Sequence, residues 1–196
     1  MTDYKYIITE EIYNKCQQFA DNSVNTSLDK YARRNQHDIR KIKKDIRNGK
    51  IGEEGTYLLL NNKLPTLSQP DHNIYQKKDK SWSSDLKDET GIQLAVKSQD
   101  IDSALAYGDS WVFQFNNGGK YDCDASVFKE CNPLHYVAFN SLNVPKRYGV
   151  IRAVVKIEWL HNKNLFREMK LPQLRGNKLA IYYEDIIKYE NELWQL

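Results

Sequence analysis

Three acidic residues and one lysine are the side chains whose types and order suit catalysis. Glu53 and Glu54 stand next to each other, Asp85 follows further along the chain, and Lys97 comes soon after it. Mg²⁺ prefers oxygen ligands, typically one or two carboxylates completed by water and phosphate oxygens. A lysine beside such an ion can orient a water molecule or offset the negative charge that develops at phosphorus. The set therefore suits metal-assisted hydrolysis of a phosphodiester bond.

Two short strands are expected to hold Asp85 and Lys97. Residues 82–88 are partly apolar, and residues 92–98 alternate between apolar and polar side chains. A three-residue turn that ends at Gly91 can join them, because glycine accepts the left-handed conformation that such a turn needs. This register makes Lys97 a diagonal neighbour of Asp85 on the same face, roughly 7–8 Å away. A four-residue turn would instead place the two on opposite faces.

A helix is expected to bring a glutamate to these strands. Residues 52–60 carry apolar side chains at helical spacing, and Glu54 lies nearer to the apolar side than Glu53, which lies further toward solvent. A carboxylate on the apolar side points toward the sheet. This argument favours Glu54 as the helper acid.

Taken in order, these pieces resemble the PD-(D/E)XK nuclease superfamily and, within it, the type II restriction endonucleases. The resemblance lies in segments 48–54 (NGKIGEE), 82–86 (WSSDL), 92–99 (IQLAVKSQ) and 110–114 (SWVFQ). It implies an α/β fold with a restriction-endonuclease-like mixed central sheet flanked by helices. It also implies double-stranded DNA as the substrate, Mg²⁺ as the cofactor, and products with a 5′-phosphate and a 3′-hydroxyl.

The resemblance also implies roles for individual residues. Asp85 would anchor the metal, Glu54 or Glu53 would complete its shell, and Lys97 would position the nucleophile, with Gln99 assisting. The family's Gly-Glu pair falls on Glu53, whereas the helical pattern favours Glu54, so both glutamates remain candidates.

One departure and one rival affect these assignments. Ala95 stands where the family has an acid two places before the lysine. Three alternatives follow: a helix glutamate takes its place, Gln93 or Gln99 supplies a neutral ligand, or the site is inactive; the first is favoured. Asp71 belongs to the only Pro-Asp pair in the chain and competes with Asp85. Asp85 is favoured because it lies on a strand that pairs with the strand of Lys97.

The segment 30–50 is rich in lysine and arginine. A basic helix suits contacts with phosphates, which make affinity depend on salt, and Asn and Gln pair well with adenine. The alternative is a charged face that is only solvated. The candidate DNA-binding residues are Arg33, Arg34, Asn35, Gln36, Arg40, Lys43 and Lys44.

Two further groups have weaker functional interpretations. Asp122 and Asp124 would hold a second metal ion, although acidic residues after a Gly-Gly pair more often form a turn. Cys123, Cys131 and His135 match no standard zinc spacing, so roles in the core or in turns are favoured.

Composition predicts one domain over residues 1–196, with a helical N-terminal region. The chain has 196 residues, 40% of them hydrophobic, and a formal net charge of +3, which is too mild to prove a nucleic-acid partner. Three cysteines without a CxxC pair and no long apolar stretch predict a cytoplasmic protein with no membrane partner, and the resemblance to restriction enzymes implies a bacterial or archaeal cell. A homodimer is expected, because a two-fold protein matches a palindromic site.

The remaining pattern predicts the order of the elements. Helices are expected at 9–20, 27–48, 52–60 and 183–193, with a polar break at 22–26 and a stop at Asn48-Gly49. Further strands are expected at 110–115, 135–140 and 150–159.

Overall fold

The computed structural model describes residues 4–32, 36–75, 84–115, 124, 128, 132–176 and 178–196. Several residues of the predicted sites lie outside these ranges: Arg33, Arg34, Asn35, Asp122, Cys123 and Cys131. In the described ranges, no helix combines the length and the apolar content that are needed to cross a membrane.

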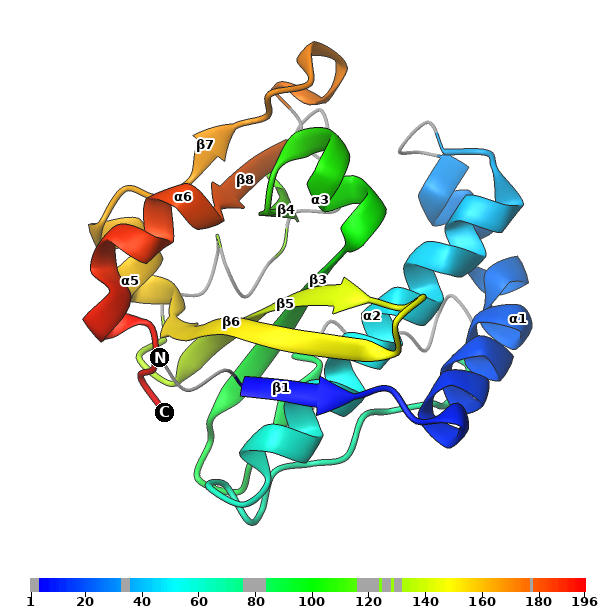
Figure 1. The fold of residues 1–196 in the computed structure, drawn as a ribbon, viewed down its shortest axis with the longest axis horizontal. Coiled ribbons are helices and arrows are strands. Elements are labelled where there is room, and N and C mark those ends of the chain that lie inside the picture. Colours follow the sequence, from blue (N-terminus) through cyan, green and yellow to red (C-terminus); the bar gives the residue numbers. More distant parts are fainter. Residues whose placement is uncertain are drawn as a thin grey trace.

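A curled, mixed five-stranded sheet forms the centre of this α/β protein (Figure 1). β3 runs parallel to β5, and every other neighbouring pair is antiparallel. In spatial order the strands are β1 (Tyr4–Ile7), β6 (Tyr148–Lys156), β5 (His135–Asn143), β3 (Gln93–Asp100) and β2 (Leu86–Lys87).

A second, antiparallel sheet has the order β4-β8-β7, and α3 (Ile101–Tyr107) leads from β3 into it. Its strands are β4 (Ser110–Gln114), β8 (Lys178–Tyr182) and β7 (Arg167–Glu168). Short helical segments complete this part of the molecule: α5 (Ile157–Asn162), η2 (Pro172–Leu174), α6 (Tyr183–Ile186) and η3 (Ile187–Glu192).

Two long helices, α1 (Glu10–Ala32) and α2 (Ile39–Leu60), lie side by side; α2 packs on the central sheet and α1 packs on α2 (Figure 1). The predicted break at 22–26 is wrong, because Ser23 and Val24 are buried and the helix continues through them. The predicted stop at Asn48-Gly49 is also wrong. Asn48 is buried and donates to Asp100 Oδ2 at 3.2 Å, so tertiary contacts outweigh the local stop signal.

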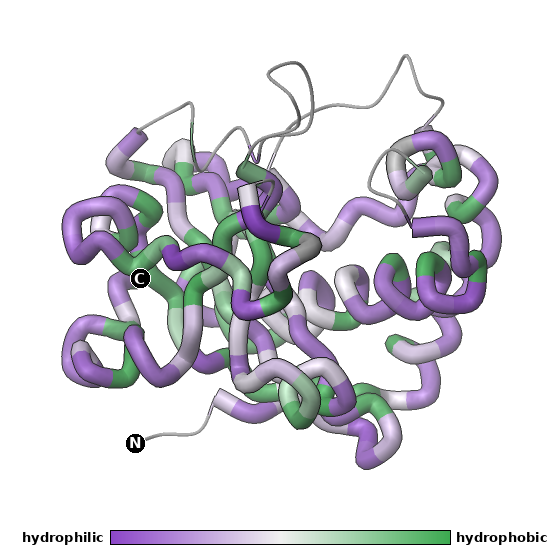
Figure 2. The backbone as a smooth tube through the Cα atoms, turned by 90° about the horizontal axis from the view of Figure 1, so that it is seen from above, coloured by the Kyte–Doolittle hydropathy of each residue, from purple (hydrophilic) through white to green (hydrophobic). Residues whose placement is uncertain are grey.

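The central sheet has one apolar cluster on each face. Hydrophobic residues, drawn in green, are frequent along the strands in the interior of the molecule (Figure 2). Leu94 and Val96 of β3 belong to the cluster under α1 and α2, whereas Ala95 packs with Trp111 and Phe113 of β4. Side chains therefore alternate between the two faces along β3, as expected for a strand.

Close packing of α2 on the sheet depends on two glycines. A Cβ at Gly52 would lie 1.9 Å from Ser98 Oγ, and one at Gly55 would lie 2.0 Å from the ring of Tyr6. Any larger residue at either position would push the helix away from the strands. These glycines therefore fix how closely the glutamates between them approach the edge of β3.

The strands expected at 110–115, 135–140 and 150–159 are present with shifted ends. The last one stops at Lys156, where α5 begins. The single helix expected at 183–193 is instead a short α-helix followed by a 3-10 helix with a kink at Tyr189. Six elements of the described chain have no counterpart in the predictions: β1, α3, α5, β7, η2 and β8.

Candidate nuclease site

The hairpin of β2 and β3 has the predicted register. Asp88 N–H donates to Ile92 O at 3.0 Å, Leu86 pairs with Leu94, and Gly91 has a φ of 92°. The two-residue strand β2 begins only at Leu86, directly after Asp85. The three-residue turn is thus confirmed, and Asp85 stands where the two strands separate.

The Asp85 side chain accepts a backbone hydrogen bond from β3 just beyond the last pair of β2 and β3 residues. Its Oδ2 accepts from Val96 N–H at 2.7 Å, a backbone donor at the point where pairing with β2 has ended. Loss of hydration raises the pKa of the Asp85 carboxyl and Asp124 adds to the rise, while the Val96 N–H, Lys97 and Lys50 oppose it. Its charge therefore interacts with both lysines, although the residue as a whole is exposed.

Lys97 projects from the face of β3 that carries the second sheet. Its Nζ lies 2.9 Å from Asp124 Oδ2 and 4.8 Å from the centre of the Phe113 ring. The same Asp124 oxygen accepts from Gln114 N–H at 2.8 Å, which orients the carboxylate. Sequence reasoning considered Asp124 as a turn residue or as a ligand of a second metal and missed this ion pair, because the partners lie far apart in the chain.

Glu53 approaches Asp85 from α2, around the edge of the sheet. The pKa of Glu53 is raised to about 8, with burial as the largest cause, a further contribution from Asp85, and opposition from Lys50. Lys50 forms an ion pair with Glu53 one turn away, and only 11% of the Glu53 side chain is exposed. The carboxyl is thus a buried acid beside a second acid, an arrangement that a bound cation stabilises.

Glu54 faces a different part of the molecule. Its Oε1 lies 2.7 Å from Lys15 Nζ on α1 and 2.7 Å from His72 Nε2. Burial alone would raise the pKa of Glu54, but the bonds to these two partners lower it. The expectation that Glu53 lies further toward solvent than Glu54 is wrong, since both are buried. Glu54 ties α2 to α1 and to the loop that follows α2.

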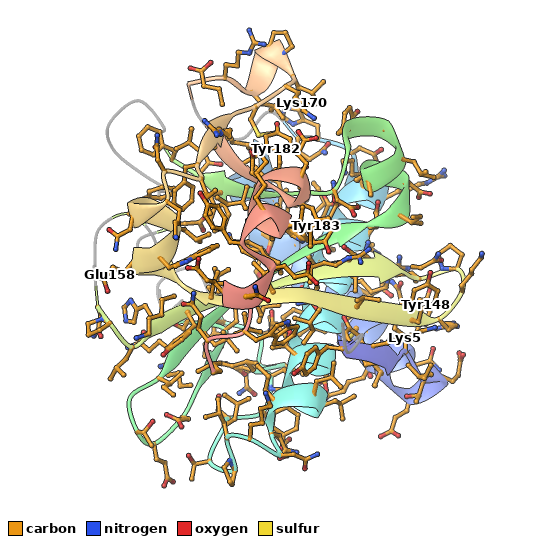
Figure 3. The ribbon with its side chains drawn as sticks, turned by 60° about the vertical axis from the view of Figure 1, so that its left-hand side comes forward. Lys5, Tyr148, Glu158, Lys170, Tyr182 and Tyr183 are labelled. Atoms are coloured by element: carbon orange, nitrogen blue, oxygen red, sulfur yellow. The ribbon has the colours of Figure 1, made fainter. Side chains whose placement is uncertain are left out.

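Two hollows meet beside these groups. The acidic hollow, of about 420 Å³, is lined by Lys50, Glu53, Asp71, Asp85 and neighbours. The lysine hollow, of about 670 Å³, is lined by Lys41, Lys97, Asp124, Lys170, Lys178 and neighbours. Tyr31 and Asp45 line both, so the hollows adjoin. In the lysine hollow, Lys170 Nζ lies 4.6 Å from the ring centre of Tyr182 (Figure 3).

Asp71 and Asp85 therefore both reach the acidic hollow. Asp71 Oδ2 accepts from the Tyr75 hydroxyl at 2.7 Å, and its Oδ1 accepts from Asn73 N–H at 2.8 Å. These bonds hold the Asp71 carboxylate within its own loop. Asp85 has the closer link to β3 through Val96 N–H.

Gln99 and Ala95, the two uncharged residues considered for the predicted site, both serve to hold the fold together. Gln99 Oε1 accepts from Ser110 N–H at 2.8 Å, and its Nε2 donates to Gly108 O at 3.0 Å, so Gln99 joins β3 to the start of β4. Ala95 is buried in the core between the two sheets. Neither position supplies the acid that the resembled family has before its lysine.

A metal ion at this site would have few protein side chains as ligands. Among the residues that the structure describes, no three His, Cys, Asp or Glu side chains gather closely enough to hold an ion. Glu53 and Asp85 supply two carboxylates, which suits Mg²⁺ because that ion keeps several waters and takes phosphate oxygens.

The described part of the basic segment is mostly ion-paired. Lys43 binds Asp21 at 2.7 Å, and Lys44 binds Asp100 and Asp102 at 2.9 and 2.7 Å. The side chain of Arg40 is exposed, and Gln36 lines the lysine hollow. His135 is buried at the start of β5, and neither ring nitrogen has a hydrogen-bond partner among the described residues.

Comparison of the chain with protein-family models, with curated proteins and with solved structures finds no match.

Proposed function

We propose that the chain is a Mg²⁺-dependent endonuclease of the PD-(D/E)XK type that hydrolyses double-stranded DNA. The observation that carries the proposal is the acidic hollow at the open edge of β3, which Glu53 and Asp85 line together, next to the hollow that Lys97 lines. Two carboxylates and a lysine around one strand edge match the needs of phosphodiester hydrolysis. A mixed central sheet with α2 and α1 stacked over one of its faces is compatible with a restriction-endonuclease-like fold.

Each group has a distinct role in this proposal. Asp85 and Glu53 bind the ion, which supplies an activated water and offsets charge on the phosphate. The Lys97 ammonium orients the nucleophile and neutralises charge that develops at phosphorus, while Asp124 holds that ammonium in place. Glu53 rather than Glu54 is the helper acid, because Glu54 is bound by Lys15 and His72.

One arrangement differs from the sequence-based expectation. Lys97 projects toward the second sheet, whereas α2 covers the opposite face of β3. The three groups therefore act together only around the strand edge that β2 leaves open beyond Leu86. The proposal depends on that edge remaining accessible to a phosphate.

Digestion of a sequenced plasmid tests the proposal. The wild type is expected to cut with Mg²⁺ and to stop cutting in EDTA, and Lys97→Ala is expected to bind DNA without cutting it. Lys87→Ala is the matched control, since Lys87 is an exposed lysine on the same hairpin. Full activity of Lys97→Ala would refute the assignment.

The form of the products separates related functions. Discrete fragments identify a site-specific restriction enzyme, which would act as a homodimer on a palindrome. Smears, or a preference for branched DNA, identify a repair nuclease or a resolvase of the same fold.

One observation favours a second candidate, a DNA-binding module without catalysis. Ala95 is buried and offers no ligand where the resembled family has an acid. Retained DNA binding with no cutting under any divalent metal would select this candidate over the nuclease.

A further inference from the structure

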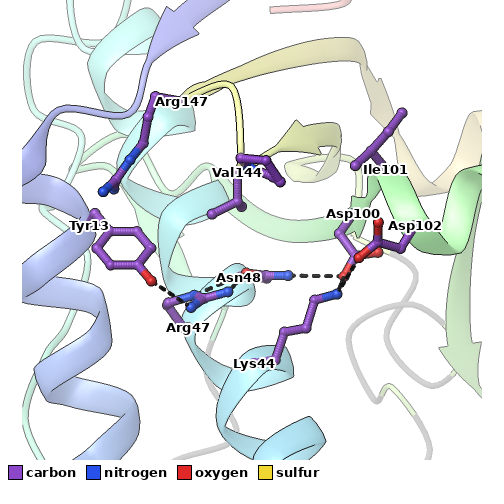
Figure 4. A pocket seen from close by; sticks show the side chains of 10 residues that line it. Tyr13, Lys44, Arg47, Asn48, Asp100, Ile101, Asp102, Val144 and Arg147 are labelled. Carbon is purple, nitrogen blue, oxygen red and sulfur yellow. Dashed lines mark hydrogen bonds and ion pairs between the residues drawn. The ribbon is translucent and has the colours of Figure 1, made fainter.

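A cavity of about 360 Å³ lies between α1, α2, the start of α3 and the turn that joins β5 to β6 (Figure 4). Arg47 from α2 and Arg147 from the turn both line it. Both guanidinium groups lie against Tyr13, at 5.0 Å and 3.9 Å from its ring centre. The cavity thus has two cations at one end, supported by the same aromatic ring.

Arg47 carries a positive charge that no carboxylate among the described residues neutralises through a hydrogen bond. It donates to Tyr13 Oη at 2.9 Å, to Gln17 Oε1 at 3.1 Å, and from two nitrogens to Asn48 Oδ1 at 3.3 Å. All of these acceptors are neutral, and one Nη2–H remains unused. A partly buried cation with only neutral partners favours the binding of an anion.

Arg147 has one guanidinium nitrogen without a partner. Its Nη1 is buried and has no acceptor among the described residues, while Nη2 bonds to Glu10 at 2.9 Å. Its φ of 56° belongs to the tight turn that joins β5 to β6. The unsatisfied buried donor is therefore the feature that points to an acceptor at the cavity.

The opposite end of the cavity has a different character. Lys44 pairs with Asp100 and Asp102, and the Asp102 side chain is 71% exposed, so water screens its charge. Ile101 and Val144 supply apolar surface between the two ends. This arrangement leaves room for an organic group beside an anion, with a carboxylate that can accept from a hydroxyl.

We propose that this cavity binds a sugar phosphate, with the phosphate against Arg47 and Arg147 and the sugar toward Ile101 and Asp102. Arginine is suited to this task because its planar fork bonds two phosphate oxygens at once. The ligand is either a free molecule or one unit of a nucleic-acid backbone. The inference does not require that the protein cuts DNA.

Calorimetric titration of the full-length protein, without divalent metal, tests this inference. Ribose 5-phosphate is expected to bind the wild type, and ribose is not. Arg47→Gln is expected to weaken binding at least ten-fold, whereas Arg167→Gln, an exposed arginine on β7, leaves it unchanged. Equal affinity of the wild type and Arg47→Gln would overturn the proposal.

A short DNA duplex, titrated in parallel, identifies the source of the phosphate. If Arg47→Gln weakens DNA binding and ribose 5-phosphate does not bind, the site holds a backbone phosphate. If only ribose 5-phosphate binding depends on Arg47, the ligand is a free molecule. If neither ligand depends on Arg47, the proposal fails.

A measurement on the wild type covers the case in which Arg47→Gln does not fold. The arginine Nε–Hε resonances of Arg47 and Arg147 are expected to shift on addition of ribose 5-phosphate or of the duplex. Arg47→Lys, which keeps the charge but loses the planar fork, assigns the first resonance. Resonances that do not move with either ligand would refute the site.

Discussion

Replacement of Glu53 by glutamine tests the buried acid on which the proposed site depends. The pKa of Glu53 rises from 4.5 to about 8 in the folded protein. Each unit corresponds to about 1.4 kcal/mol, so ionised Glu53 destabilises the fold by up to about 5 kcal/mol relative to its protonated form. The folded state binds the proton more tightly, and the free energy of unfolding therefore falls as pH rises from 4.5 to 8.

Glutamine has no proton to lose, so Glu53→Gln should escape this penalty. The difference in unfolding free energy, variant minus wild type, is expected to increase by about 1.4 kcal/mol per pH unit between pH 5 and pH 8. Folded wild-type Glu53 is mainly protonated over this range, so replacing the neutral acid by a neutral amide beside Lys50 shifts the whole curve by a roughly constant amount. The slope is therefore the diagnostic quantity.

Urea denaturation followed by circular dichroism, at half-unit steps of pH, measures this slope. Glu54→Gln is the matched control, because the pKa of Glu54 is lowered and its contribution is already complete above pH 4.5. Its difference curve should stay negative over the same range, whereas that of Glu53→Gln should climb from pH 5 to pH 8. A flat curve for Glu53→Gln would refute the reasoning, since Glu53 would then ionise as it does in water.

Three further outcomes are expected. Gly55→Ala should lower Tm by roughly 6–12 °C, because its Cβ would overlap the buried Tyr6 ring. Gly49→Ala is the control and should leave Tm unchanged, because there is open space around Gly49. Equal Tm values for the two variants would contradict this reasoning. Arg147→Gly should be more stable than Arg147→Ala by about 1 kcal/mol in urea denaturation, since only glycine accepts a φ of 56° without strain. Asp124→Asn should reduce DNA cutting at least ten-fold while changing stability by less than about 1 kcal/mol, because its ion pair is partly exposed.

The sequence was sufficient where local chemistry decides the structure. A glycine in the left-handed conformation set the turn, and the turn set the register that places Asp85 beside the strand of Lys97. The alternation along β3 likewise gave the correct faces, because strand periodicity depends only on neighbouring residues.

Long-range contacts explain what the sequence did not reveal. A helical wheel places Glu54 toward the sheet, but it contains no information about Lys15, which reaches Glu54 from another helix. Asn48 reads as a helix stop until its bond to Asp100 is known. The partner of Lys97 was equally hidden, because Asp124 arrives from a segment beyond β4.

The pairing of β1 with β6 has a consequence for synthesis of the chain. Tyr4 lies opposite Ile151, and Tyr4 also stacks on Trp194 with ring centres 3.6 Å apart. At about 5–20 residues per second, the ribosome needs roughly 7–30 s to deliver the partner strand. During that interval β1 is an unpaired edge that can associate with other chains. Nascent chains stalled before Ile151 should therefore aggregate or recruit chaperones, and release should follow emergence of β6.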